Sequence, residues 1–564
     1  MKAYPQTPEE LLTWDWPQFE PAANELVNLS LNTANVNEWL QDWSDLSANL
    51  YEMGNRLYLA TTVNTADTNA EKAYTHFIDQ ILPKGMEVEQ ALKQKLLESG
   101  LEPAGFEVAL RNIRAEASLF RQENLELLSE EFKLSNEYDK IVGAQTVIWE
   151  GQEQTLSQLR PVQQETDRSR REQAWRLGAQ RQLEDRASLN ELWGRLLTLR
   201  CQLAANAGKP DYRAYRWQQQ LRFDYTPADC VRFQEAIESV VVPACTRIYE
   251  RRRQKLGLQS LRPWDLEVDP AGRPPLRPYK EESELKARTS SIFHRVDPEL
   301  GAYFDRMVSE NLLDLTNRKN KAPGGYCTDF PVVRRPFIFM NGVGLHSDVQ
   351  TLLHEGGHAF HVFESFAIPL MQLLQVPMEF AEVASMGMEL LASPYLEESA
   401  GGFYSPEDAA RALTEHLESS MLFWPYMAVV DAFQHWVYEN PHQAENPADC
   451  EATWVHLWNR FMPGVDWSGL EDELATGWQR KLHIFQTPFY YVEYGLAQLG
   501  AVQVWDNAQK DQMAAVARYR RALALGGSVT LPQLFHTAGA RLAFDRETLS
   551  AAVTLIESKI SSLS

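Results

Sequence analysis

Apolar residues in the first 200 positions recur at steps of three and four, with polar residues between them. This spacing places the apolar side chains on one face of a helix, because an α-helix has 3.6 residues per turn. One such stripe consists of Leu40, Trp43, Leu46, Leu50, Met53 and Leu57. The stretch 163–200 is rich in Arg, Glu and Gln, which predicts long helices with solvated, ion-paired faces. Residues 1–200 are therefore expected to form an N-terminal helical region.

Proline and glycine interrupt this pattern at residues 206–210 and again, more densely, at 258–278. Such interruptions are typical of loops. We place a boundary near residue 200, so that a catalytic region occupies 201–564, and interpret 258–278 as a connection inside that region.

The best strand candidate covers Val332–Met340 and follows a glycine turn at 321–327. Pro336 restricts this strand to an edge or an end of a sheet, because proline cannot donate a ladder hydrogen bond. An exposed edge could bind an extended peptide through its backbone. A short hairpin that only supports its neighbours explains the pattern equally well.

Length, charge and cysteine usage restrict the class of protein. With 564 residues the chain exceeds the size of a single hydrophobic core, so two or more domains are expected. Its net charge of -23 argues against nucleic-acid and membrane-surface partners, because it would repel phosphates and anionic lipids. Five cysteines without Cys-x-x-Cys spacing suggest neither a disulfide framework nor a cysteine zinc site. Without a signal peptide or a long apolar run, a cytoplasmic location is expected.

The strongest chemical signal is a His-Glu-x-x-His motif formed by His354, Glu355 and His358. On a helix, His354 and His358 lie one turn apart and can offer two imidazole nitrogens to one zinc ion. Glu355 then lies beside that ion, where it can act as a general base towards water. This geometry is that of a zinc hydrolase.

The motif lies in a predicted helix over 349–363, which Ser347 or Asp348 can cap. Gly356 and Gly357 together cost such a helix about 2 kcal/mol relative to alanine. We therefore expect a local reason for them, such as close approach of substrate or of another helix.

A catalytic zinc site needs a third protein ligand, and three acids compete for this role. Glu364 has the spacing of one zinc-protease class, but that class requires glycine where this chain has His361. Glu379 and Glu382 both lie on the next predicted helix. We choose Glu382, because Glu389 lies seven residues further on the same face and could orient a ligating histidine.

These residues resemble the thimet oligopeptidase and oligoendopeptidase F family of zinc metallopeptidases, and the oligoendopeptidase F branch is closer. The resemblance is specific over roughly residues 205–550. One departure is Gly356, where relatives usually carry a bulkier residue. Besides the zinc motif, the similar segments are Gly325–Cys327, Phe337–Asn341, Phe380–Met386 and Pro488–Tyr494.

The resemblance implies a mainly α fold, with two helical halves around a deep substrate channel and a small β element beside the zinc helix. It implies that residues 1–200 cover one side of this channel. It also implies one Zn²⁺ per chain, with Glu382 as the third ligand, as in gluzincins. The implied activity is an oligoendopeptidase that hydrolyses internal bonds of short unfolded peptides.

The same resemblance suggests where a transition-state oxyanion would be bound. His483, Tyr491 and Tyr494 lie where the family carries its substrate- and transition-state-binding His and Tyr residues, and their side chains can donate hydrogen bonds. Tyr490 is a weaker candidate in the same cluster.

Two other functions remain open at this point. A zinc carboxypeptidase of related helical fold would use the same metal motif, and a peptide-binding scaffold could carry an idle site. Intact Glu355 argues against the scaffold, because an idle site has no need of a general base. His361 is interpreted as structural or as part of the rim, whereas the sequence assigns no role to His346.

Overall fold

The computed structural model describes residues 4–318, 320–322 and 324–563. The chain is mainly helical and divides into two compact units, each assembled from three separate segments. Unit 1 comprises residues 1–117, 277–409 and 500–542, and unit 2 comprises 118–276, 410–499 and 543–564. The expected boundary near residue 200 falls inside helix α10 (Arg186–Asn206) of unit 2. The division into a covering region 1–200 and a catalytic region 201–564 stays a prediction.

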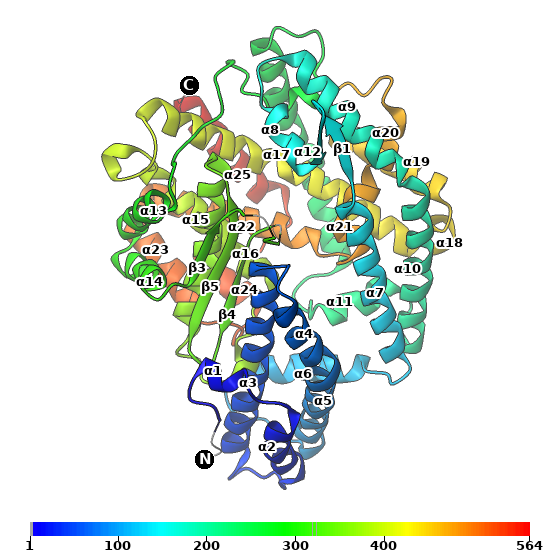
Figure 1. The fold of residues 1–564 in the computed structure, drawn as a ribbon, viewed down its shortest axis with the longest axis vertical. Coiled ribbons are helices and arrows are strands. Elements are labelled where there is room, and N and C mark those ends of the chain that lie inside the picture. The colour runs from blue at the N-terminus through cyan, green and yellow to red at the C-terminus, as the bar shows by residue number, and fades with distance from the viewer. Residues whose placement is uncertain (1–3, 319, 323, 564) are drawn as a thin grey trace. The chain divides into compact units, whose positions relative to one another are not determined.

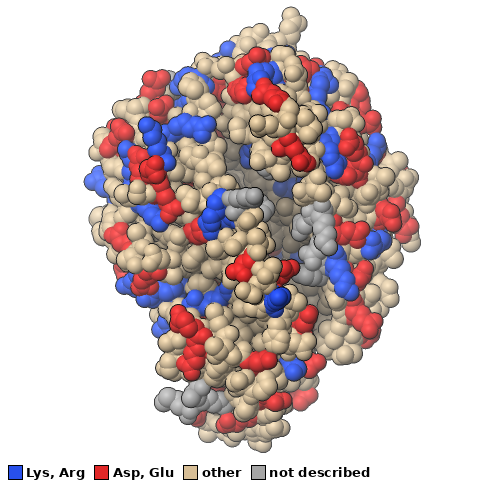
Figure 2. Space-filling view, viewed as in Figure 1, with Lys and Arg blue, Asp and Glu red and all other residues tan. Residues whose placement is uncertain are grey.

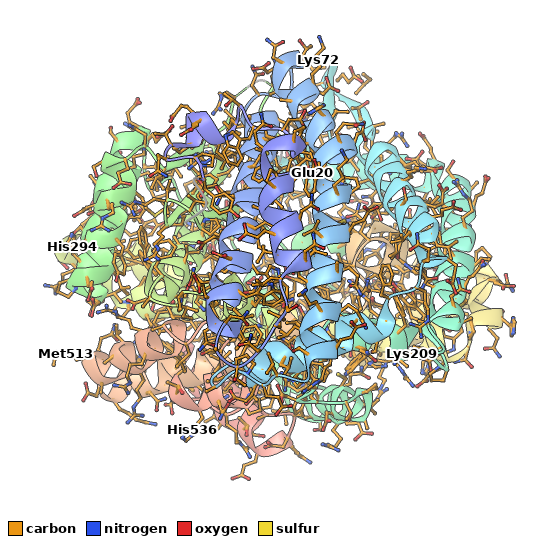
Figure 3. All side chains as sticks on the ribbon, turned by 90° about the horizontal axis from the view of Figure 1, so that it is seen from below. Glu20, Lys72, Lys209, His294, Met513 and His536 are labelled. Atoms are coloured by element: carbon orange, nitrogen blue, oxygen red, sulfur yellow. The ribbon has the colours of Figure 1, made fainter. Side chains whose placement is uncertain are left out.

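The N-terminal segment of unit 1 is a group of helices around an aromatic core. Its elements are α1 (Pro8–Leu11), α2 (Trp16–Asn28), α3 (Val36–Val63), α4 (Thr68–His76), the π-helix η1 (Phe77–Ile81), α5 (Leu82–Ser99) and α6 (Glu107–Leu119). The predicted apolar stripe lies on α3, and its side chains are buried or packed against this core. Glu20 on α2 and Lys72 on α4 carry the polar, exposed side of the same helices (Figure 3).

The rest of unit 1 combines a three-stranded sheet with the helices that carry the metal motif. These elements are α13 (Glu282–Val296), α14 (Pro298–Ser309), β3 (Leu313–Thr316), β4 (Tyr326–Phe330), β5 (Arg335–Gly342), α15 (His346–Ser365), η4 (Met371–Leu373), α16 (Met378–Ala392), η5 (Ser393–Tyr395), η6 (Glu398–Ala400), α23 (Gln512–Leu523) and α24 (Leu531–Thr537). Helix α15 packs against α16 and against strands β4 and β5.

The sheet has the order β3-β5-β4, with β3 parallel and β4 antiparallel to the central strand (Figure 1). The predicted strand is therefore the central strand, so that of the two predicted positions, an edge or an end of the sheet, the edge is excluded. Pro336 does lie at an end, as the second residue of β5, so it removes at most one bond from the ladder. The edge strands of this sheet are β3 and β4, and the residues of β4 are half-buried or buried. The predicted glycine turn includes Pro323, which lies outside the described residues.

Residues Val332–Arg334, predicted as strand, form a turn. Arg334 has a φ of 55°, a left-handed conformation that is incompatible with a strand. The buried carboxylate of Glu52 on α3 accepts the amides of Val332 and Val333 at 2.7 and 3.2 Å. A long-range partner thus replaces the ladder hydrogen bonds of this segment.

Unit 2 is built from helices and one β-hairpin. Its elements are α7 (Asn124–Gly143), β1 (Thr146–Trp149), β2 (Gln152–Thr155), η2 (Ser157–Leu159), α8 (Arg160–Gln163), α9 (Arg168–Glu184), α10 (Arg186–Asn206), α11 (Tyr212–Gln219), α12 (Pro227–Lys255), η3 (Pro263–Asp265), α17 (Pro406–Glu439), α18 (Pro441–Ala444), α19 (Pro447–Phe461), α20 (Glu471–Ala475), η7 (Thr476–Arg480), α21 (Leu482–Phe485), α22 (Tyr491–Lys510) and α25 (Arg546–Leu563). Residues 406–409 of α17 and 500–510 of α22 belong to unit 1. Buried rings of Trp193, Trp478, Phe485 and Phe433 pack together in its core.

The charged stretch 163–200 contains more than solvated helix. Arg171 on α9 is 2% exposed and donates to Asp265 Oδ1 at 3.1 Å, and Arg168 binds the same carboxylate at 2.8 Å. Asp265 lies in the proline-rich connection, which these ion pairs fix to α9.

The surface carries both signs of charge. On the face shown in Figure 2, Lys and Arg side chains are interspersed with Asp and Glu. Among the described residues, every helix is too short or too polar to span a lipid bilayer.

Candidate metal centre and aromatic cluster

Helix α15 starts with a capping arrangement centred on Asp348. Its Oδ2 accepts the backbone amides of Val343 and Leu345, both at 2.8 Å, and the Tyr279 hydroxyl at 2.6 Å. Helix starts leave such amides unsatisfied, so these bonds stabilise the first turn. The helix begins at His346 with Leu345 at the N-cap position, so the predicted cap at Ser347 or Asp348 is wrong; both residues lie in the first turn, from which Asp348 binds the preceding amides.

Helices α15 and α16 bring the three predicted metal ligands together. Glu382 Oε2 lies 3.4 Å from His354 Nε2 and 3.7 Å from His358 Nε2. Two ligands bound to a tetrahedral zinc at about 2.0–2.1 Å are roughly 3.3 Å apart. The donor set and its spacing therefore fit a zinc ion. Metal ligation itself stays a prediction.

Further side chains orient these donors. Glu389 Oε1 lies 2.6 Å from His354 Nδ1, so a proton on Nδ1 leaves the Nε2 lone pair directed towards Glu382. Ser385 donates from Oγ to Glu382 Oε2 at 2.9 Å. The contact between Glu389 and a histidine is the one that the seven-residue spacing on α16 predicts.

The two glycines of the motif allow close packing on two sides. A Cβ at Gly357 would lie 2.5 Å from the backbone oxygen of Ala384 on α16. A Cβ at Gly356 would lie 2.6 Å from Cζ of Phe293 on α13. The expected reason, close approach of another helix, is thus present at both positions. At Gly357 it sets the short distance between the two ligand-bearing helices.

Glu355 lies beside the predicted ligands, next to the charged groups of His354, Glu382 and Glu389. Its side chain is nearly buried, and the backbone amide of Cys327 on β4 donates a hydrogen bond to its carboxylate. Burial raises the pKa of Glu355 to about 7, with His354 opposing and Glu382 adding to the shift. Its Oε2 has no hydrogen-bond partner among the described residues and can accept a proton.

The protonation states at this site suit a cation. Burial lowers the pKa of His358 to about 4, which leaves a neutral imidazole. Burial would raise the pKa of Glu382, but the hydrogen bond from His354 and the charge of His358 lower it, so the carboxylate is ionised. Burial also disfavours charge on His354, yet its bonds to Glu382 and Glu389 raise its pKa well above the ordinary value. A cation that binds His354 therefore displaces a proton.

The other acids considered as a third metal ligand, and the other two histidines of α15, make different contacts. Glu364 forms an ion pair with Arg520 at 2.7 Å, and the group of possible metal donors around the two histidines contains Glu382 but neither Glu364 nor Glu379. His361 is buried against Phe380, in agreement with a structural role. His346 Nδ1 lies 2.6 Å from the Tyr404 hydroxyl.

The predicted oxyanion donors form one aromatic cluster in unit 2. The ring of His483 lies 4.9 Å from that of Tyr491 and 6.0 Å from that of Tyr494, and the ring of Tyr490 packs edge-on against that of Tyr494. Burial and the charge of Lys481 lower the pKa of His483 to about 3, so its imidazole is neutral near pH 7. Burial raises the pKa of Tyr491, which keeps its hydroxyl protonated. The seven predicted site residues thus form two groups, one in each unit.

Sequence reasoning missed three arginines that hold the segment leading to this cluster. Buried Arg200 donates to the backbone oxygen of Ile484 at 3.2 Å and also to that of Phe485. Arg216 donates to the Pro488 carbonyl at 3.2 Å, and Arg222 donates to the Phe489 carbonyl. These arginines lie more than 260 residues from the carbonyls that they bind, so no local sequence signal marks the contacts.

A helical fold with a His-Glu-x-x-His helix and a third acid on the adjacent helix is typical of metallopeptidases. The sequence profile of Peptidase family M3 matches residues 162–554, and that of the Peptidase M3 N-terminal domain matches 10–116. The chain belongs to Peptidase family M3. No curated protein matches the sequence.

Solved structures refine this assignment. PZ peptidase A, determined with an inhibitor, has a TM-score of 0.88 and 29% identity, covering 99% of this chain and 98% of its own. A protein assigned as oligoendopeptidase F has a TM-score of 0.88 and 28% identity, with the same coverage. Another so assigned, from Bacillus anthracis, has a TM-score of 0.84 and 26% identity, covering 99% and 97%. The chain therefore lies in the oligoendopeptidase F branch of the family, and it is a peptidase.

Proposed function

We propose that this peptidase is a zinc-dependent oligoendopeptidase that cleaves internal bonds of short, unfolded peptides. The observation that carries the proposal is the convergence of His354, His358 and Glu382, with Glu355 on the same helix. Endopeptidase action and the preference for short peptides rest on the likeness to oligoendopeptidase F.

Two imidazoles and one carboxylate form a donor set that is typical of catalytic zinc. Zinc bound there would act as a Lewis acid and lower the pKa of water towards about 7. Glu389 and Ser385 keep the donors in place through their bonds to His354 and Glu382.

Glu355 moves the proton in this proposal. Its buried Oε2 accepts a proton from the attacking water and then delivers it to the leaving amine. The amide of Cys327 on β4 holds the carboxylate in one orientation during both transfers.

We assign His483, Tyr491 and Tyr494 as hydrogen-bond donors to the oxyanion that forms from the scissile carbonyl. A donor aimed at developing charge contributes about 3 kcal/mol to the transition state. The neutral imidazole of His483 and the protonated hydroxyl of Tyr491 both retain a hydrogen to donate.

Hydrolysis of a mixed peptide library, followed by mass spectrometry, tests the proposal. We expect internal cleavage of short peptides that stops with a chelator and returns with added zinc. Each peptide is supplied with a free and with an amidated C-terminus, which separates internal cleavage from carboxypeptidase action. Cleavage only at free C-termini, or cleavage that survives metal removal, would contradict the proposal.

A further inference from the structure

A second group of metal-type donors lies inside unit 2, apart from the predicted zinc motif. Cys230 is near the start of α12, and Asp431 and His435 lie one turn apart on α17. One donor atom from each of the three lies within 4.8 Å of the others. The side chains are buried, with Cys230 and Asp431 at 0% exposure and His435 at 4%.

Two polar atoms in this group have no hydrogen-bond partner within the described part of the chain. They are Asp431 Oδ1 and His435 Nε2, both fully shielded from solvent. Asp431 Oδ2 accepts Gln234 Nε2 at 2.7 Å, but His435 Nε2 lies 3.5 Å from it. Burying unpaired polar atoms costs free energy, and a buried carboxylate needs compensating positive charge.

We propose that Cys230, Asp431 and His435 bind a second divalent transition-metal ion, of the zinc class, with a structural role. Thiolate and imidazole donors select zinc or its congeners over magnesium and calcium, which prefer oxygen. A cation here would satisfy both unpartnered atoms and neutralise the carboxylate. The site lies within one unit and does not depend on the proposed function.

The geometry fits such an ion after small side-chain rotations. Nitrogen and oxygen ligands of tetrahedral zinc are roughly 3.3 Å apart, close to the 3.5 Å between His435 Nε2 and Asp431 Oδ2. The Cys230 sulfur needs only a short shift to join them. A water molecule, or the side-chain oxygen of Gln234 after an amide flip, would complete the tetrahedron.

One neighbour has to change its contact when the ion binds. When a metal binds His435 Nε2, the imidazole proton is on Nδ1. Arg213 lies 3.3 Å from Nδ1 and is also a donor, so the two groups cannot hydrogen-bond in this state. Arg213 also forms an ion pair with Glu439, and this ion pair can persist when the contact with His435 is lost. The rings of Trp217 and Phe489 lie 6.0 and 5.2 Å from the His435 ring and separate it from solvent.

An ion in this position would connect α12 to α17. Gln434, between its two α17 ligands, accepts the amide of Phe489 at 2.7 Å. Phe489 precedes the tyrosines of α22. The ion would therefore stabilise the part of unit 2 that holds the aromatic cluster, without contacting a substrate.

Cobalt substitution of the full-length protein tests the site, because only a cysteine ligand produces a thiolate-to-cobalt charge-transfer band. We expect this band in the wild type at saturating Co²⁺, and two bound ions per chain. Glu382→Ala should lose one ion and keep the band. Cys230→Ala and His435→Gln should each lose one ion, and Cys230→Ala should lose the band.

Cys245→Ala is the matched control, since Cys245 is a buried cysteine on the same helix outside the group. It should keep both ions and the band. If Cys230→Ala does not fold, the wild-type spectrum still decides the question. A wild type without a charge-transfer band at saturating cobalt, or with an unchanged band in Cys230→Ala, would overturn the proposal.

Discussion

The two metal-type groups of this protein share one plan and differ in their surroundings. Each takes two donors one turn apart on one helix and a third from a neighbouring helix. In the His354–His358–Glu382 group, the histidine side chains are 25% and 22% exposed, and a carboxylate accepts from His354 Nδ1. In the Cys230–Asp431–His435 group, every member is buried, and the histidine faces an arginine.

This difference separates a site for chemistry from a site for structure. In the proposed mechanism, partial exposure lets a peptide and water reach the first group, and Glu355 beside it exchanges a proton with them. The proposed second site is buried, and one of its three donors is a cysteine. Structural zinc sites are closed, whereas catalytic ones keep an open position.

The largest expected effect is that of Glu382→Ala. Removing one of three ligands should release one ion per chain and abolish peptide hydrolysis, because two imidazoles alone hold zinc weakly. Metal analysis and a peptide assay measure both effects. Glu364→Gln is the control and should keep the ion, since Glu364 pairs with Arg520. Full metal content in Glu382→Ala would transfer the ligand role to Glu379 or Glu364.

Glu355→Gln should separate proton transfer from metal binding. We expect kcat to fall on the order of 10³-fold, because general-base catalysis is lost. The metal content should stay unchanged, since Glu355 is not a ligand in this account. Turnover close to that of the wild type would remove Glu355 from its role as general base.

Glu389→Gln tests whether the contact between Glu389 and His354 strengthens metal binding. Loss of a carboxylate partner for a ligating histidine typically weakens metal affinity about 10- to 100-fold. Competition with a chelator measures this affinity. Affinity equal to that of the wild type would show that the 2.6 Å contact with His354 does not tune the site.

The two glycines of the motif should differ when replaced by alanine. Gly357→Ala places a Cβ against the backbone of α16 and should cost about 1–3 kcal/mol of unfolding free energy. Gly356→Ala meets the buried Phe293 side chain and not backbone, and it gains helix propensity of about 1 kcal/mol, so its net cost should be smaller. Denaturant unfolding distinguishes them, and equal destabilisation would contradict the role of Gly357 in setting the helix spacing.

His361 should affect stability but not metal binding, although it shares the helix of the ligands. Burial lowers its pKa to about 3, below the value of about 6.5 in an unfolded chain. The unfolded state therefore binds an extra proton as the pH falls below about 6.5, and stability decreases towards about pH 3. Between about pH 7 and pH 5 the wild type should lose about 2 kcal/mol more than His361→Gln. Parallel pH profiles of the two proteins would contradict this assignment.

Local patterns predicted much of the first group. Helical spacing alone placed His354 and His358 together, and the seven-residue step on α16 placed Glu389 behind Glu382. The buried face of α3 was likewise predicted from its apolar stripe, because buried positions in a helix recur with the helical period. The turn at Val332–Arg334 was not, because Glu52 satisfies its amides from about 280 residues away.

The Cys230–Asp431–His435 group could not be predicted from local sequence patterns. Cys230 is separated by about 200 residues from Asp431 and His435, and no Cys-x-x-Cys spacing marks it. Only the packing of α12 against α17 brings these donors together. The same holds for Arg200 and Arg222, whose carbonyl partners are remote in sequence. Sequence patterns thus reveal sites built on one helix and its successor, but not sites built by distant packing.

Anomalous diffraction at the zinc absorption edge, from crystals of active protein, tests the central claim most directly. We expect an anomalous peak bonded to His354, His358 and Glu382, at about 2.0–2.2 Å from each donor atom. Active crystals without a peak at these three residues would contradict it.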